Sequence, residues 1–73
     1  MIEPIEIKKF LYQYIAVGVP HEIIPDKLFF YFGTLKKIYQ NEIKIETNRG
    51  FKIIPINNIM EIHKEKRNDK RKQ

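Results

Sequence analysis

The side chains of this 73-residue chain that could do chemistry include two histidines and several carboxylates, but they form no catalytic constellation. His21 and His63 lie far apart and no cysteine accompanies them, so the ligand spacing of a zinc site is missing. There is no nucleophile–base pair and no glycine-rich phosphate loop. Glu42, Glu46 and Glu61 fall on predicted solvent faces rather than in a cleft. We therefore expect no enzyme, no metal and no cofactor, and infer no small-molecule substrate.

The strongest basic cluster lies at the C-terminus, over residues 64–73. Six cations against two carboxylates supply four of the five net positive charges, so the preceding residues are close to neutral. Such a polar block buries no apolar area, and we expect it to be disordered or a frayed strand extension. It is either a phosphate-binding arm with salt-dependent affinity or, since it lacks interleaved aromatics, a solubilising terminus. Its candidate contacts are Lys64, Lys66, Arg67, Lys70, Arg71 and Lys72.

A second set of candidate nucleic-acid contacts lies within the body of the chain, close to predicted turns. Tyr39 could stack on a base while Lys36 and Lys37 meet phosphates. The alternative for the two lysines is a solvated strand face, where they also block pairing of strand edges. The remaining candidates are Asn41, Arg49 and Lys52.

The strands that must position these side chains are predicted over residues 28–62. Residues 28–32 are apolar on both faces, and a strand tolerates this only when both are covered. Gly33 then predicts a bend where backbones approach closely, which lets a small sheet curl and close. Strict alternation over residues 42–47 predicts a half-buried strand, and residues 48–50 a hairpin loop.

Further short strands complete the expected sheet. A first strand over residues 16–19 ends at Pro20, and the returning half of the hairpin over residues 51–54 ends at Pro55, because proline cannot donate to a strand ladder. A tight corner or helical turn at residues 57–58 precedes a last strand over residues 59–62. The strands are short, antiparallel and evenly spaced, which predicts a small five-stranded, strongly bent antiparallel barrel.

One helix is predicted at the N-terminus, over residues 4–15, with Pro4 in its first turn. Its single apolar stripe favours a lid over one barrel opening, with a partner-binding helix as the alternative. The fold class is therefore all-β with one N-terminal α-helix, in a single domain of residues 1–63 followed by the basic tail. The stripe consists of Ile7, Phe10, Leu11, Tyr14 and Ile15.

Composition sets the expected location and assembly. The chain has no apolar run long enough for a transmembrane helix, and acidic residues stand where a secretory signal would be basic. We expect a cytoplasmic protein that does not contact a membrane. A core this small, without disulfides, favours a homo-oligomer. Abundant isoleucine, lysine and glutamate fit a thermophilic, for instance archaeal, source or an A/T-rich genome equally.

With its elements in this order, the chain resembles the Sm-like (Lsm) family of small barrels. The run Phe32-Gly33-Thr34-Leu35 is similar to the family's aromatic, glycine and leucine pattern in its bent second strand, and residues 53–59 fall where the family closes its barrel. The resemblance covers residues 4–63. Barrels of the Src-homology-three-like type share this strand order. The resemblance implies a ring formed through edge-strand pairing, and RNA as the usual ligand.

The family's uridine-binding motifs are absent from this sequence. Residues 39–42 replace the expected Asp and Met-Asn, and Pro55-Ile56 replaces Arg-Gly, so those roles are not transferred. Two hypotheses follow. One is a nucleic-acid-binding protein, for RNA with DNA left open, in a ribonucleoprotein or a homo-oligomeric ring. The other is a protein-interaction module or assembly subunit that uses the aromatic residues 29–32 and has no nucleic-acid role.

Overall fold

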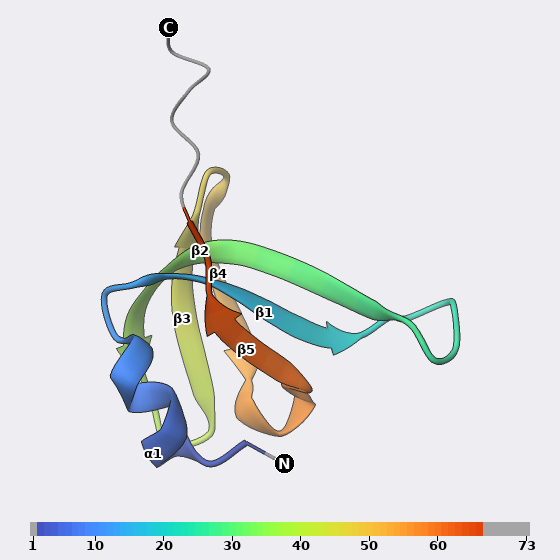
Figure 1. Ribbon diagram of the computed structural model, residues 1–73, viewed down its shortest axis with the longest axis horizontal. Coiled ribbons are helices and arrows are strands. Elements are labelled where there is room, and N and C mark those ends of the chain that lie inside the picture. Colours follow the sequence, from blue (N-terminus) through green and yellow to red (C-terminus); the bar gives the residue numbers. More distant parts are fainter. Residues whose placement is uncertain (1, 67–73) are drawn as a thin grey trace, which may run out of the picture.

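The computed structural model describes residues 2–66 of the chain as one antiparallel sheet with a short N-terminal helix (Figure 1). Four residues of the expected basic arm, Arg67, Lys70, Arg71 and Lys72, lie outside the described residues. The strands are hydrogen-bonded in the order β4-β3-β2-β1-β5. In chain order the elements, with η for a 3-10 turn, are α1 (Pro4–Ile7), η1 (Lys8–Phe10), β1 (Tyr14–Pro20), β2 (Leu28–Ile38), β3 (Glu42–Thr47), β4 (Gly50–Pro55), η2 (Ile56–Asn58) and β5 (Glu61–Lys64).

The predicted class, a small all-β fold of five antiparallel strands with one N-terminal helix, is confirmed. The sheet is not closed into a barrel, which differs from the closure expected from the sequence. β4 and β5 stand at the two ends of the strand order. Pro55 ends β4, η2 carries the chain across to β5, and β5 pairs with β1. The two end strands therefore do not pair with each other within the described chain.

The hydrophobic core lies on one face of the sheet. Ile43 and Ile45 are fully buried, as the alternation in β3 predicts. Ile7 is also fully buried, so the N-terminal helix covers part of this face. On the β3–β4 hairpin the opposite face carries charged and aromatic side chains, such as the exposed Glu46 and Phe51. The core residues are Ile7, Ile15, Val17, Leu35, Ile43, Ile45, Ile54, Ile56 and Ile59.

The N-terminal helix is shorter than the predicted residues 4–15. α1 ends at Ile7 and η1 at Phe10, whereas Tyr14 and Ile15 belong to β1. The helical prediction was therefore wrong for the second half of the segment. No helix within residues 2–66 has the length and apolar character needed to cross a bilayer.

The helix ends early because the backbone turns to pair with β2. Tyr12 has φ of 68°, a left-handed conformation that stops a helical run. Its N–H donates to the carbonyl oxygen of Leu35 at 2.7 Å, and the N–H of Leu35 donates to that of Gln13 at 3.0 Å. Ile15 and Val17 then point into the core at strand spacing. Ile15 fits both the apolar stripe of a helix and the alternation of a strand. Pairing with β2, which is distant along the chain, determines that it belongs to a strand.

The first and last strands are also displaced along the sequence. β1 begins at Tyr14 rather than at residue 16, and β5 covers Glu61–Lys64 rather than residues 59–62. Ile59 is instead a buried core residue that follows η2. The N–H of Glu65 donates to the carbonyl oxygen of Tyr14 at 2.9 Å, so backbone contact with β1 continues just past β5. The start of the predicted basic tail, including Lys64, is therefore part of the sheet.

β2 is the longest strand, and it curves strongly across the sheet (Figure 1). At Gly33 an added Cβ would lie only 2.6 Å from the backbone oxygen of Glu46. A bulge between Leu35 and Lys37 adds a local irregularity to the pairing with β3. The prediction that two backbones approach closely at Gly33 is confirmed.

Replacement of this glycine tests how tight the approach is. Gly33→Ala should lower the free energy of unfolding by about 1–3 kcal/mol, because the methyl group would meet rigid backbone atoms. Gly18→Ala is the matched control, since its Cβ would meet the ring of Phe30, which can move. Urea denaturation of both variants gives the comparison. Equal losses in the two variants would contradict the backbone contact as the cause.

Candidate nucleic-acid interface

A groove lies between the N-terminal half of β2 and the tip of the β3–β4 hairpin. Residues 28–34 of β2 pair with β1, but pairing with β3 begins only at Thr34. The β2 edge before Thr34 is therefore free of β3, and side chains from both faces of the strand reach the groove. Its volume is about 1130 Å³. We call it the hairpin groove; its aromatic and cationic lining consists of Tyr14, Phe29, Phe30, Tyr31, Phe32, Arg49, Phe51, Lys52 and Lys66.

Three aromatic residues of the hairpin groove are exposed to solvent. Phe29 and Phe32 are each 46% exposed, and Phe51 is 60% exposed. The Nζ of Lys44 lies 4.4 Å from the centre of the Phe51 ring, a cation–π contact that covers part of the ring. Exposed rings beside cations are the platforms on which single-stranded nucleic acids stack their bases.

The hairpin tip is held by the hydroxyl of Thr47. Its Oγ1 accepts a hydrogen bond from the N–H of Arg49 at 3.0 Å and donates one to the carbonyl oxygen of Gly50 at 2.8 Å. Gly50 has φ of 113°, where a side chain would be strained. The hairpin predicted over residues 48–50 is confirmed, and these contacts fix the backbone of Arg49 at the mouth of the groove.

The charges along the hairpin groove leave its cations available. Its two carboxylates, Glu46 and Glu65, each have a neighbour: Glu46 is 3.5 Å from the Nζ of Lys36, and Glu65 is 3.5 Å from Nδ1 of His63. Exposed pairs of this kind contribute at most about 1 kcal/mol. Arg49 makes no ion pair with any residue that the structure describes. The guanidinium is thus free to meet a phosphate.

The predicted contacts separate into two groups. Arg49, Lys52 and Lys66 line the hairpin groove. Tyr39 and Asn41 lie at the other end of the sheet, in the turn between β2 and β3, which Figure 1 shows beside α1 and away from the hairpin tip. The sequence-predicted residues therefore do not form one site.

Three other predicted lysines are not lining residues of the groove. Lys36 lies at the margin of the groove, because it forms an ion pair with the lining residue Glu46. Lys37 faces Lys44 across the β2–β3 pair. Lys64, in β5, pairs with Ile15 of β1. Lys37 is exposed, which fits a phosphate contact and a solvated strand face equally.

Phe51 lines the groove but was not among the contacts predicted from the sequence, although a signal for its exposure was present. The alternation that turns Ile43 and Ile45 inward turns Glu46 outward, and Phe51 pairs with Glu46 across the hairpin. An exposed aromatic residue is informative where it joins a larger apolar patch, and Phe51 lines the same groove as the exposed Phe32. The free edge of β2 had no comparable signal, because it depends on where β3 stops pairing.

The histidines and acids do not assemble into a metal centre within residues 2–66, where no group of three or more His, Cys, Asp or Glu side chains could hold an ion. Nδ1 of His21 instead accepts hydrogen bonds from the N–H groups of Ile23 and Ile24 at 3.1 and 3.0 Å. His21 is therefore a locally bonded loop residue.

No protein-family model, curated protein or solved structure matches the chain.

The role of Thr47 gives a test of the hairpin tip. Thr47→Val keeps the shape of the side chain but loses both hydrogen bonds, and should lower the free energy of unfolding by about 1–2 kcal/mol. Thr47→Ser retains the hydroxyl and should lose less. Chemical denaturation measures the stability, and amide exchange at Arg49 reports on the tip. Equal exchange rates in the two variants would show that the hydroxyl does not hold it.

Proposed function

We propose that the protein binds single-stranded nucleic acid, RNA in particular, in the hairpin groove. The observation that carries this proposal is the combination of the exposed rings of Phe32 and Phe51 with the cations Arg49 and Lys66 along one groove. Stacking is open to unpaired bases, whereas a duplex keeps its bases inside. The cations then neutralise the phosphates that connect the stacked bases.

The proposal extends to assembly, as a homo-oligomer or as part of a ribonucleoprotein. β4 and β5 end the sheet, and unpaired end strands are templates for pairing with another chain. Ile53 of β4 is 43% exposed, and pairing would cover it. A helix followed by five antiparallel strands, with close backbone approach at Gly33, supports the suggested relation to Sm-like proteins. The cytoplasm is the location we propose, because RNA is available there.

A protein-interaction module is the second candidate. Phe29 and Phe32, on the part of β2 that does not pair with β3, are each 46% exposed, and an exposed aromatic patch is typical of a partner-binding surface. This candidate uses the same groove but gives the cations no role. The salt dependence of binding therefore separates the two functions.

A salt-series titration of oligo-U, oligo-A and duplex DNA tests the proposal. Arg49→Ala should make the slope of log K against log salt shallower by about 0.7, the value for one phosphate contact to a single strand. Phe51→Ala should weaken binding roughly 5- to 150-fold with little change in slope, because stacking involves no counterion release. Lys37→Ala is the control, since Lys37 lies outside the groove.

Equal effects of the groove substitution and the control substitution would contradict binding in the hairpin groove. If Lys37→Ala weakened binding as much as Arg49→Ala, the affinity would come from the overall charge and not from the groove. If the wild-type protein bound none of the three nucleic acids at moderate salt, the protein-interaction module would become the leading function.

A further inference from the structure

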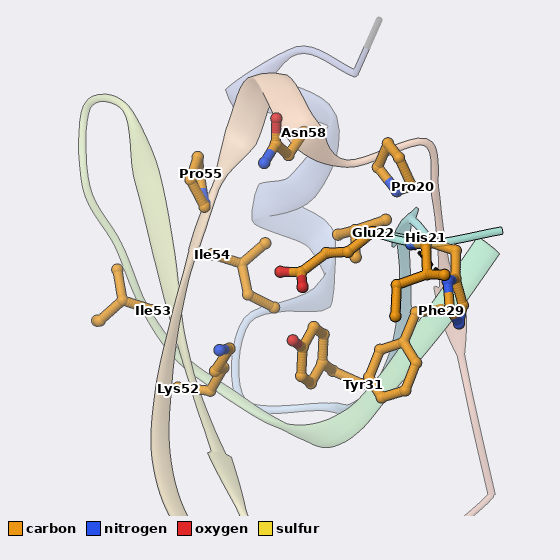
Figure 2. A pocket seen from close by; sticks show the side chains of 12 residues that line it. Pro20, His21, Glu22, Phe29, Tyr31, Lys52, Ile53, Ile54, Pro55 and Asn58 are labelled. Carbon is orange, nitrogen blue, oxygen red and sulfur yellow. Dashed lines mark hydrogen bonds between the residues drawn. The ribbon is translucent and has the colours of Figure 1, made fainter. Parts of the chain in front are cut away.

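A second cavity lies between the loop that joins β1 to β2 and the strand β4 (Figure 2). We call it the loop cavity. It has a volume of about 610 Å³, inside the range of about 300–1,000 Å³ that is usual for small-molecule sites. Phe29, Tyr31 and Lys52 line both this cavity and the hairpin groove, so the two spaces are adjacent.

The walls of the loop cavity suit a flat, partly apolar ligand. Phe29 and Tyr31 contact each other edge to face, with their ring centres 4.9 Å apart and an angle of 72° between the planes. Val19 and Ile54 supply further apolar surface from β1 and β4. Aromatic and aliphatic walls of this kind favour a planar ring.

Two opposite charges, from the exposed residues Glu22 and Lys52, reach into the loop cavity. Figure 2 shows the carboxylate of Glu22 pointing into the cavity from the loop, while Lys52 and Tyr31 extend into it from the sheet. The Nζ of Lys52 lies 4.8 Å from the centre of the Tyr31 ring. Within residues 2–66, Glu22 makes no ion pair and no side-chain hydrogen bond. Its carboxylate can therefore accept hydrogen bonds from a ligand.

The loop that carries Glu22 is tied down on both sides of that residue. Nδ1 of His21 accepts the N–H groups of Ile23 and Ile24, and the N–H of His21 donates to the carbonyl oxygen of Lys27 at 2.9 Å. The ring of His21 also lies against that of Phe29, with ring centres 6.3 Å apart. These contacts hold the backbone of Glu22 beside the cavity, which reduces the ordering cost of binding a ligand there.

We propose that the loop cavity binds a guanine base. Guanine presents two adjacent N–H donors, N1 and N2, which a single carboxylate can accept together, and its O6 and N7 accept from a cation. Adenine places the bare N1 nitrogen on that edge, and cytosine places N3 there, so each would oppose the Glu22 carboxylate. Uracil offers one N–H between two carbonyl oxygens. Adenine and cytosine each give the carboxylate a single amino donor, whereas guanine can satisfy both oxygens of Glu22 and still present O6 and N7 to Lys52.

The base can come from a free guanine nucleotide or from an RNA strand that continues out of the hairpin groove. The second case rests on the proposed function, because the RNA must first occupy the groove. The first case does not. Both share the same recognition chemistry, in which the base inserts between the aromatic wall and the carboxylate.

The test is a calorimetric titration of the wild-type protein with GMP, AMP, CMP and UMP, which carry the same charge. GMP should bind about tenfold more tightly than the others, within the 1–3 kcal/mol expected for one bidentate contact. Glu22→Gln should abolish this preference, because the amide replaces one acceptor with a donor. Glu61→Gln removes an exposed carboxylate outside the cavity and should leave it intact.

A parallel titration compares oligo-U with oligo-U that contains one guanine. The guanine-containing strand should bind about tenfold more tightly than oligo-U, and Glu22→Gln should remove this gain in affinity. That result supports recognition of a guanine within RNA, whether or not GMP binds. Selective GMP binding without that gain supports the free nucleotide. If neither GMP selectivity nor the guanine gain appears, the inference is overturned, while oligo-U binding would leave the proposed function standing. Selective GMP binding without oligo-U binding would refute the proposed function alone.

Discussion

The contact between the backbones of Gly33 and Glu46 is the constraint on which both candidate sites depend. From Thr34 onward, β2 pairs with β3. Before Thr34, β2 pairs with β1 alone, and its other edge is free of β3. That edge borders the hairpin groove, and its side chains Phe29 and Tyr31 continue into the loop cavity. If β2 paired with β3 along its whole length, neither space would be open.

Local chemistry made most of the sheet predictable. Proline at position 55, the alternation of Ile43 and Ile45, and a glycine with positive φ at position 50 each act within a few residues, so the sequence determines their effect directly. The helix over residues 4–15 could not be bounded in this way, because Ile15 fits a helical stripe and a strand equally well. Closure of the sheet into a barrel could not be predicted either, because it depends on whether β4 pairs with β5.

The candidate site was predictable in chemistry but not in position. The sequence identifies Arg49 and Lys66 as cations near a hairpin and a terminus, and the fold brings both to one groove. It gives the same weight to Tyr39, which the bent β2 carries to the far end of the sheet. Glu22 had no distinguishing feature in the sequence, because its proposed role depends on a cavity that β2 and β4 complete, and Lys52 and Ile54 of β4 are distant along the chain.

Amide chemical-shift mapping is the most direct measurement of the central claim, that nucleic acid occupies the hairpin groove. The ¹⁵N-labelled protein would be titrated with oligo-U and the shift of each amide followed. We expect the largest changes at Phe32 and from Arg49 to Phe51, with little change at Lys37 and Tyr39. Saturable changes concentrated at Lys37 and Tyr39, with the groove amides unmoved, would contradict it.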